Sequence, residues 1–390
     1  MDTDTLETPS RPIPQQPGWR DHPYLPTVHR ELAGRPGLVQ ANGTDRLHAL
    51  LAQVATGEAR IVMAGDCSED PAECGSEDVA RKSGLLEMLA GRVRMTTRKP
   101  VIRAARIAGQ YAKPRSSPVE LVEGRELPSY RGHMVNSPEP DPELRIPDPA
   151  RILTGYTAAR EVMRHLGWCD ETTGPRDGAP IWTSHEALLL DYETPMLRHA
   201  PDGRIFLAST HWPWLGERTR DPAGAHVALL ADIANPVACK IGPAIDTDEL
   251  LTLCERLDPD RVPGRLTLIA RMGAGTTQDR LPLLVDRVRT AGHPVVWLSD
   301  PMHGNTVSTP SGLKTRYVET IIREVQEFQA AVQAMGGAAG GLHLETTPDQ
   351  VTECVPNRFH VSEVPGKYTS FCDPRLNPDQ ATAVASAWTA

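Results

Sequence analysis

The 390-residue chain lacks any long hydrophobic run. A membrane-spanning helix needs roughly 18 or more apolar residues in succession, so the sequence predicts no membrane partner. Residues 1–7 are acidic and contain no apolar core, which argues against a signal peptide or a transit peptide. The seven cysteines are odd in number and form no CxxC pair, which disfavours a disulfide framework and fits a reducing compartment. We therefore expect a cytoplasmic protein.

An excess of positive charge is also missing. The net charge of −9 speaks against a nucleic-acid partner, because phosphate backbones attract basic proteins. A local cationic pocket remains compatible with an acidic whole. No GxGxxG follows the first expected strand, and the glycine-rich stretch 336–341 precedes a strand instead of opening a helix. Neither pattern therefore indicates a phosphate-binding loop.

What the chain does contain is an alternation of short apolar runs and helical patterns. Residues 1–40 are rich in proline and read as an extended arm, and helical spacing follows at 44–55. Apolar or β-branched runs then occur at 60–64, 101–107, 187–190, 205–208, 237–239, 266–269, 294–298 and 341–344. Helical patterns lie at 248–257, 279–291 and 314–335, and the segment 116–180 reads as a long excursion around one loop.

Eight strands alternating with helices predict an α/β fold, a (β/α)8 TIM barrel with a short N-terminal extension. We expect an N-terminal arm and helix at 1–57 and a catalytic barrel at 58–390, together one domain. A doubly wound sheet is the structural alternative, although it would be unusually large.

Residues with metal-binding side chains follow several of these runs. The stretch 299–306, Ser-Asp-Pro-Met-His-Gly-Asn-Thr, carries His303, and other strand ends lead to Cys67, Glu345 and Asp373. Barrel active sites collect at the carboxyl ends of the strands, so these four residues predict a divalent metal site. A thiolate, an imidazole and two carboxylates suit Mn, Co, Fe or Zn better than Mg or Ca. Taken singly, Cys67 also reads as a small buried hydrophobe and His303 as a hydrogen-bonded turn residue.

A second group at the same strand ends is cationic. It consists of Arg106, Lys113, Arg115, Arg218, Lys240 and Arg271. Lysine and arginine are rarely buried without a partner, yet Lys240 and Arg271 directly follow apolar runs. Guanidinium and ammonium groups pair with phosphate and carboxylate oxygens, so we expect an anionic substrate with more than one charged group. Internal salt bridges to Glu217, Asp300 and Glu345 are the alternative.

Seven motifs follow one another from about residue 40 to the C-terminus. They read Gly-Asp-Cys-Ser-Glu, Arg-Ile-Ala-Gly-Gln-Tyr-Ala-Lys-Pro-Arg-Ser, Leu-Pro-Ser-Tyr-Arg-Gly, Gly-Glu-Arg-Thr-Arg, Lys-Ile-Gly-Pro, Ser-Asp-Pro-Met-His-Gly-Asn-Thr and Cys-Asp-Pro-Arg-Leu-Asn. In this order they resemble type II 3-deoxy-D-arabino-heptulosonate 7-phosphate (DAHP) synthase. The resemblance implies a metal-dependent (β/α)8 barrel, a transferase that condenses phosphoenolpyruvate with erythrose 4-phosphate in the first step of the shikimate pathway.

The resemblance also assigns roles to residues. The implied metal ligands are Cys67, His303, Glu345 and Asp373, with Mn²⁺ or Co²⁺ expected first and Fe²⁺ or Zn²⁺ as alternatives. The implied ligands of the phosphate and carboxylate of phosphoenolpyruvate are Arg106, Lys113, Arg218, Lys240 and Arg271. Arg115 and Ser116 would bind the phosphate of the aldose. Glu217 would orient a water, and Lys113 would donate a proton once neighbouring cations lowered its pKa. The expected catalytic set is thus Lys113, Glu217, Cys67 and His303.

Cys372 stands next to Asp373 and raises a regulatory hypothesis. If its sulfur lies near Cys67, oxidation would tie up the metal-binding thiolate in a disulfide and inactivate the enzyme. An inert buried thiol is the alternative.

The chain departs from longer members of the family in its regulatory segments. Those members carry a larger N-terminal extension and an additional helical pair, which form aromatic amino-acid sites, whereas the interval 116–217 is short here. We therefore expect weak or absent inhibition by tryptophan and phenylalanine, and a role in secondary metabolism such as phenazine or other antibiotic pathways.

Two other functions remain open at the level of sequence. One is an aminoDAHP synthase-type enzyme that uses an amino-aldose phosphate, and the other is a non-catalytic regulatory partner of a shikimate enzyme. The intact metal and cationic residues argue against lost catalysis. The expected partners are the two small phosphorylated substrates and a second copy of the chain, in a homodimer whose Pro-rich arm could pack across the interface.

Overall fold

The computed structural model describes residues 11–122, 124–168 and 179–390. Within them, eight parallel strands close into a barrel in the order β1-β14-β11-β10-β9-β8-β5-β2. The barrel strands are β1 (Arg60–Gly65), β2 (Val101–Arg106), β5 (Ile181–Glu186), β8 (Trp212–Leu215), β9 (Val237–Ile241), β10 (Leu266–Ala270), β11 (Val296–Ser299) and β14 (Ala338–Glu345). The expected (β/α)8 fold is confirmed.

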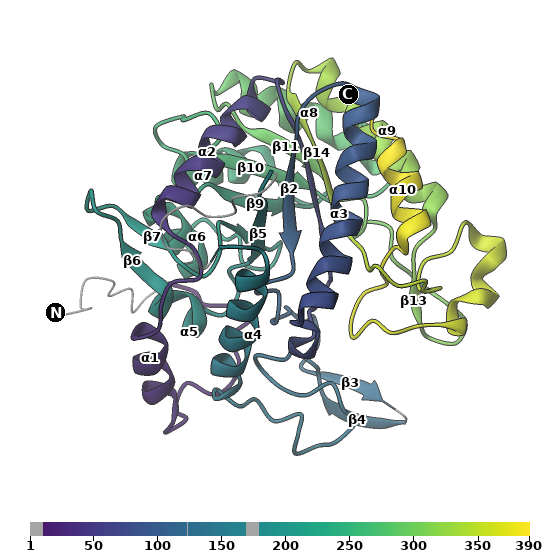
Figure 1. Ribbon diagram of the computed structural model, residues 1–390. Coiled ribbons are helices and arrows are strands. Elements are labelled where there is room, and N and C mark those ends of the chain that lie inside the picture. Colours follow the sequence, from purple (N-terminus) through teal and green to yellow (C-terminus); the bar gives the residue numbers. More distant parts are fainter. Residues whose placement is uncertain (1–10, 123, 169–178) are drawn as a thin grey trace.

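Helices alternate with these strands and cover the outside of the barrel (Figure 1). They are α1 (Leu25–Ala33), α2 (Ala41–Ala55), α3 (Ser76–Thr97), α4 (Arg151–His165), α5 (Leu190–Glu193), α6 (Ala225–Asp232), α7 (Thr247–Leu257), α8 (Thr276–Thr290), α9 (Val318–Ala334) and α10 (Pro378–Ser386). Short 3-10 helices are η1 (Pro71–Glu73), η2 (Thr194–Met196) and η3 (Arg358–Gly366). In α7, Leu250, Leu253, Cys254 and Leu257 are buried. This i, i+3, i+4, i+7 spacing turns one apolar face toward the barrel.

Two of the eight expected barrel strands are wrong. The third strand is β5 rather than 187–190, and its polar residues can be buried because Thr183 and Ser184 hydrogen-bond to the segment of β8. The run 205–208 forms β7 (Ile205–Leu207), which pairs with β6 (Leu197–His199) in a separate hairpin. The fourth barrel strand is β8, which contains Pro213, a residue that argues against a central strand when read from sequence.

The N-terminal arm is only partly extended, because it includes α1. It also packs on its own chain. The side-chain amide of Gln16 donates to the carbonyl of Leu188 at 2.8 Å, and the backbone amide of Ala225 donates to the carbonyl of Pro12 at 3.1 Å. Residues 1–10 of the expected arm, and Cys169, lie outside the described residues. The other six cysteines, which lie among the described residues, are free thiols.

Several additions lie at one end of the barrel. The hairpin of β3 (Val119–Val122) and β4 (Arg125–Pro128) and helix α1 lie at the lower end of Figure 1, toward which the arrowhead of β2 points. Strand β13 (Lys314–Thr315), which pairs with β12 (Val307–Ser308), lies at the right, below the level of that arrowhead. The C-terminus lies at the opposite end. The additions therefore surround the carboxyl ends of the strands.

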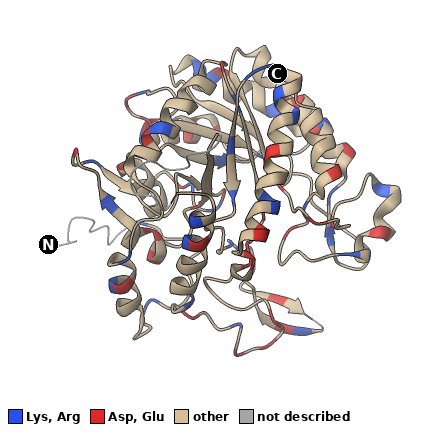
Figure 2. Ribbon diagram, in the orientation of Figure 1, with Lys and Arg blue, Asp and Glu red and all other residues tan. Residues whose placement is uncertain are grey.

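The outer surface carries charges of both signs. Figure 2 shows Lys and Arg interspersed with Asp and Glu over the helices, so the net charge of −9 is not gathered on one face in this view. In the described part of the chain, no helix is both long and apolar enough to cross a membrane.

Candidate active site

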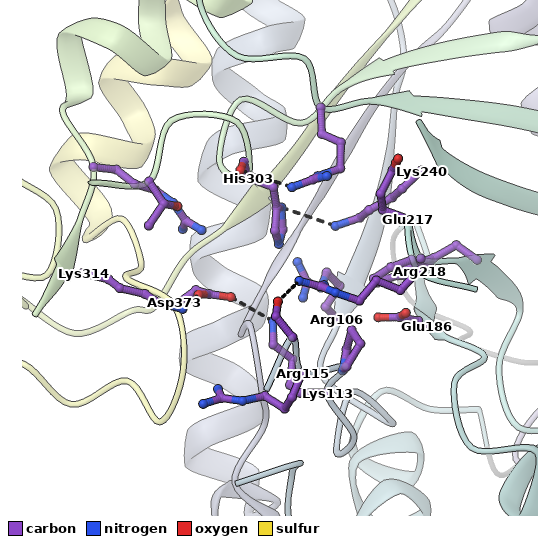
Figure 3. A pocket seen from close by; sticks show the side chains of 17 residues that line it. Arg106, Lys113, Arg115, Glu186, Glu217, Arg218, Lys240, His303, Lys314 and Asp373 are labelled. Atoms are coloured by element: carbon purple, nitrogen blue, oxygen red, sulfur yellow. Dashed lines mark hydrogen bonds and ion pairs between the residues drawn. The ribbon is translucent and has the colours of Figure 1, made fainter. Parts of the chain in front are cut away.

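A cavity of about 250 Å³ opens at the carboxyl ends of the barrel strands (Figure 3). All eight residues expected to bind substrate line it: Arg106, Lys113, Arg115, Ser116, Glu217, Arg218, Lys240 and Arg271. His303 and Asp373 of the expected metal set line it too. The structure therefore brings the cationic group and part of the metal set into one space.

Strand register places the remaining metal-set residues beside this cavity. Gly65 pairs with Arg106 on one side and with Glu345 on the other, so the ends of β2, β1 and β14 lie together. The Sγ atom of Cys67 and carboxylate oxygens of Glu345 and Asp373 lie within 4.8 Å of one another. The backbone amide of Asp373 also donates to Cys67 Sγ at 3.1 Å. Three of the four expected metal ligands thus form a compact cluster.

His303 adjoins this cluster and is oriented by Asp300. Its Nδ1 lies 2.8 Å from Asp300 Oδ2, which leaves Nε2 facing Glu345 Oε1 at 3.2 Å. Burial raises the pKa of the Asp300 carboxyl, but the nearby His303 and Lys240 outweigh this effect and hold the pKa well below its ordinary value. A carboxylate that fixes one imidazole nitrogen while the other faces a cluster of donors is the usual arrangement around a metal-binding histidine.

The surroundings of Cys67 favour its thiolate, the form that binds a metal. Burial raises the pKa of Cys67, but a hydrogen bond with Cys372 and the charge of Lys113 bring it below its ordinary value. The same hydrogen bond, with burial, raises the pKa of Cys372, which stays a thiol. The contact between the two sulfur-bearing side chains that the oxidation hypothesis requires is therefore present.

Glu345 supplies the clearest test of whether a metal fits. Burial raises its pKa, yet His303 and Arg316 hold the pKa well below its ordinary value, so the group is a carboxylate. Its buried Oε1 atom receives no hydrogen bond of good geometry from any described residue. Together with Cys67, His303 and Asp373, Glu345 completes a donor set of one sulfur, one imidazole nitrogen and two carboxylates. Such a set suits a divalent transition metal.

The floor of the cavity holds two buried cations against an aromatic ring. Lys240 Nζ lies 4.4 Å from the ring centroid of Trp214 and 2.9 Å from Asp300 Oδ2. Burial lowers the pKa of Lys240, although Asp300 acts in the opposite direction. Arg106 lies over the same ring at 5.7 Å, and one of its Nη atoms is 3.0 Å from His343 Nε2. Burial holds the pKa of His343 well below its ordinary value, so the neutral ring can accept from Arg106.

Two carboxyl groups face these cations. Glu186 ends β5, and burial raises its pKa even though the surrounding cations, led by Lys240, act to lower it. A Cβ atom on residue 216 would lie 2.0 Å from Glu186 Oε1, so a side chain at 216 would displace this carboxyl from its present position. Glu217 accepts from Arg220 at 2.8 Å through Oε1, whereas its buried Oε2 receives no hydrogen bond from a described residue. Glu217 Oε2 is thus free to accept from a water.

The opposite wall carries Arg115 and Ser116. The backbone amide of Arg115 donates to Gln15 Oε1 of the N-terminal arm at 2.9 Å, and its guanidinium pairs with Glu120. Arg218 donates to Ser116 Oγ at 2.6 Å, a contact drawn in Figure 3. This wall combines two guanidinium groups with a hydroxyl, a set suited to a phosphate group.

Lys113 lines the cavity beside the cluster of Cys67, Glu345 and Asp373, and its Nζ lies 3.2 Å from Asp373 Oδ2. Burial lowers its pKa, but Cys67, Asp373 and Glu345 outweigh burial and raise the pKa well above its ordinary value. The expectation that neighbouring cations lower this pKa is therefore wrong, because anions surround the ammonium group.

Sequence reasoning assigned no role to seven lining residues: Pro114, Glu186, Trp214, Gly216, Thr306, Lys314 and Arg316. Glu186 and Trp214 were hidden by the misplaced third and fourth strands. Lys314 and Arg316 fall in a stretch that was expected to be helical, although α9 begins only at Val318. Arg316 is fully buried and pairs with Glu345 at 2.8 Å, a contact between residues far apart in the sequence that no local sequence pattern indicates.

Comparison with known proteins agrees with this site. Residues 4–177 and 159–389 match the Class-II DAHP synthetase family. A probable phospho-2-dehydro-3-deoxyheptonate aldolase of Pseudomonas fluorescens is 54% identical, over 96% of this chain and 94% of its own. Phospho-2-dehydro-3-deoxyheptonate aldolases of Streptomyces coelicolor and Mycolicibacterium smegmatis are 36% and 37% identical, over 96% of this chain and 94% and 92% of theirs. The chain thus belongs to the Class-II DAHP synthetase family.

Proposed function

We propose that the protein is a 3-deoxy-7-phosphoheptulonate synthase. It condenses phosphoenolpyruvate, D-erythrose 4-phosphate and water to DAHP and inorganic phosphate. The observation that carries this proposal is the charge of the cavity, which is lined by eight Lys or Arg residues and by three Asp or Glu residues beside a cluster of metal donors. Such a local excess of positive charge attracts two phosphorylated substrates to an acidic protein.

The two ends of the cavity suit the two substrates. Arg106, Lys240 and Arg271, with Lys113 and Arg218, would bind the phosphate and carboxylate of phosphoenolpyruvate. Arg115 and Ser116 would bind the phosphate of the aldose at the opposite wall. With the anionic groups of the two substrates bound at opposite walls, C3 of phosphoenolpyruvate and the aldehyde carbon would meet between them. The two reactants are then held in a reactive orientation, which lowers the entropic cost of their encounter.

The chemistry then proceeds by carbon–carbon bond formation. The electron pair of the C2=C3 bond of phosphoenolpyruvate forms the new bond from C3 to the aldehyde carbon, which leaves C2 cationic, and the electron pair of the carbonyl bond moves to the aldehyde oxygen. The alkoxide formed in this step is a much stronger base than an amine, so it would take a proton from the ammonium group of Lys113 even though the surrounding anions raise the pKa of that group. A water held at the free Oε2 of Glu217 adds at C2 and would lose a proton to that carboxylate. The hydroxyl of the resulting phosphohemiketal then gives up its proton as the C–O bond to phosphate breaks, which leaves a ketone at C2 and releases inorganic phosphate.

Cys67, His303, Glu345 and Asp373 would hold a divalent metal, Mn²⁺ or Co²⁺ first, with Fe²⁺ or Zn²⁺ as alternatives. When bound, the metal supplies Lewis-acid polarisation of the aldehyde oxygen. Asp300 would keep His303 in the tautomer that offers Nε2.

A phosphate-release assay tests this function. The protein is treated with a chelator, resupplied with single divalent metals, and incubated with both substrates. We expect phosphate release only when phosphoenolpyruvate, erythrose 4-phosphate and a transition metal are all present. Absence of release with every metal would sink the proposal.

A regulatory and cellular context is part of the same proposal. We propose a cytoplasmic homodimer that feeds secondary metabolism and responds weakly to tryptophan and phenylalanine. The alignments to the Streptomyces coelicolor and Mycolicibacterium smegmatis relatives span 422 and 429 positions, more than the 390 residues of this chain, so those relatives carry insertions that this chain lacks. The absence of these insertions from this chain supports the proposal that tryptophan and phenylalanine inhibit it only weakly.

A further inference from the structure

We infer that Glu324 is a positioning residue that sets the phosphoenolpyruvate-binding loop and the metal-binding loop relative to each other. Glu324 lies on α9, outside the cavity, and touches neither reacting group. The inference rests on the proposed function, in which Arg271 binds phosphoenolpyruvate and His303 binds the metal. We call residues 271–275 the Arg271 loop and residues 300–306 the His303 loop.

The two loops lie in direct contact, backbone against backbone. A Cβ atom on residue 304 would lie 2.3 Å from the backbone nitrogen of Gly273, and one on residue 273 would lie 3.0 Å from the carbonyl oxygen of Gly304. Gly273 also has a φ of +90°, which favours glycine. The guanidinium of Arg271 donates to the carbonyl of His303 at 3.3 Å. Only glycine at both positions allows this approach, so a shift of one loop must move the other.

The side chain of Asn305 joins the same two loops. Its Oδ1 accepts from the backbone amide of Ala274, in the Arg271 loop, at 3.0 Å. Its Nδ2 donates to the carbonyl of Pro301, in its own loop, at 2.8 Å. Asn305 therefore fixes the turn that carries His303 and attaches it to the neighbouring loop.

Glu324, on α9, accepts hydrogen bonds from both loops. Its Oε1 accepts from the backbone amide of Gly273 at 2.9 Å and lies 3.1 Å from Thr277 Oγ1, while its Oε2 accepts from Asn305 Nδ2 at 2.5 Å. One carboxyl thus holds one group from each loop. The residue is 1% exposed, so water cannot replace a lost partner.

Glu327, one turn further along α9, offers a matched control. Its Oε2 accepts from the backbone amide of Gly275 at 2.7 Å, so it also binds the Arg271 loop through a backbone amide. Among the described hydrogen bonds it makes none to the His303 loop. The two glutamates differ in whether they join both loops, which is the property under test.

The experiment compares Glu324→Gln with Glu327→Gln. A glutamine at 324 can still accept from Gly273, but it then turns its amide nitrogen toward the amide nitrogen of Asn305, which breaks the bridge. The metal-free protein is titrated with Mn²⁺ by calorimetry without substrates, and KM is measured for each substrate in the metal-loaded enzyme. For Glu324→Gln we expect metal binding weakened by about tenfold and KM for phosphoenolpyruvate raised by about tenfold. KM for erythrose 4-phosphate should stay within about twofold, and Glu327→Gln should match the unmodified protein in every measurement.

The outcomes separate this inference from the proposed function. An unmodified protein that binds Mn²⁺ but shows no synthase activity would refute the function, whereas Glu324→Gln with unchanged metal binding would refute the inference. A rise in KM for both substrates, or the same losses in Glu327→Gln, would also refute it, because a general loosening of the barrel would produce them. Should Glu324→Gln fail to fold, Asn305→Ala, at a half-buried position, carries the same expectations for metal binding and KM.

Discussion

Lys240 lies between an aromatic ring and a carboxylate, and this pairing explains how an ammonium group can face substrate from a buried strand. Its contact with Asp300 offsets part of the cost of burial, and the face of Trp214 supplies a second, uncharged attraction. Arg106 contacts the same ring at 5.7 Å, so one aromatic side chain supports both cations of the pocket floor.

Removal of this ring should weaken binding of phosphoenolpyruvate. A desolvated cation–π contact contributes about 2 kcal/mol, and about 1.4 kcal/mol corresponds to a factor of ten in affinity. We expect Trp214→Leu to raise KM for phosphoenolpyruvate by about tenfold or more and to leave KM for erythrose 4-phosphate unchanged. Trp214→Phe, which keeps a ring, should show a smaller effect. Equal KM values for the Leu variant and the unmodified enzyme would contradict the role of the ring.

Glu324 should also make the stability of the barrel depend on pH. Burial raises its pKa from 4.5 to about 7, with a further contribution from Asp300 on the His303 loop, while the Gly273 amide, Asn305 and Thr277 act in the opposite direction. The folded state therefore holds this proton more tightly than the unfolded state. The stabilisation is complete below about pH 4.5 and is lost as pH rises toward about 7.

The measurement is the free energy of unfolding in denaturant between pH 5 and 8, for the unmodified protein and for Glu324→Gln. One pKa unit corresponds to about 1.4 kcal/mol, so the advantage of the unmodified protein over the variant should shrink by about 2–3 kcal/mol as pH rises. Parallel pH profiles for the two proteins would show that Glu324 does not titrate in this way.

At the scale of elements, the N-terminal arm contacts the wall of the proposed substrate site. Gln15 holds the backbone amide of Arg115 at 2.9 Å, and its own carbonyl accepts from Arg131 at 3.3 Å. The arm thus reaches the loop that follows β2, where the phosphate of the aldose would bind. If Arg115 binds the aldose phosphate as proposed, the arm would help to position that substrate.

Loss of the Gln15 contact should act on one substrate only. A hydrogen bond contributes about 0.5–1.5 kcal/mol, so we expect Gln15→Ala to raise KM for erythrose 4-phosphate by roughly threefold. KM for phosphoenolpyruvate should not change. Trp19→Phe, which removes a 2.8 Å hydrogen bond to Asp191 elsewhere in the arm, serves as the control. An increase in both KM values would indicate a general disturbance of the cavity.

The barrel strands show how much of the fold could be predicted from the sequence. Six barrel strands are apolar enough to be recognised, and the residues after them, such as Lys240 and His303, were placed correctly at the cavity. β5 and β8 were missed because one is rich in polar residues and the other contains Pro213, and each is stabilised by hydrogen bonds from residues distant in sequence. Roles that depend on such distant contacts, including those of Glu186 and Glu324, carry no local sequence pattern.

At the scale of the whole molecule, charge is distributed in two ways. The outside carries a mixture of signs and the chain as a whole is acidic, whereas the cavity concentrates cations (Figures 2 and 3). Acidic groups also occur here, namely Glu186, Glu217 and the cluster of Cys67, Glu345 and Asp373. Without a cation, the three groups of this cluster repel one another and depend on Lys113 and Arg316 for compensation.

Metal binding should therefore stabilise the fold as well as support activity. A ligand that binds only the folded state adds about 2.7 kcal/mol at a concentration of 100 times Kd. We expect Mn²⁺ to raise the Tm of the chelator-treated protein by a few degrees, as followed by calorimetry. Asp373→Asn should reduce this increase, whereas an exposed substitution such as Asp202→Asn should not. An equal increase in Tm for Asp373→Asn would place the metal elsewhere.

The contact of Gly273 with Gly304 has a consequence for the energetics of binding. Because Arg271 and His303 stand on loops that cannot shift independently, occupation of either position selects the same arrangement of both. Thermodynamic linkage then requires reciprocity: the factor by which phosphoenolpyruvate strengthens metal binding equals the factor by which the metal strengthens binding of phosphoenolpyruvate. A pair of glycines would in this way make two chemically unrelated ligands cooperative.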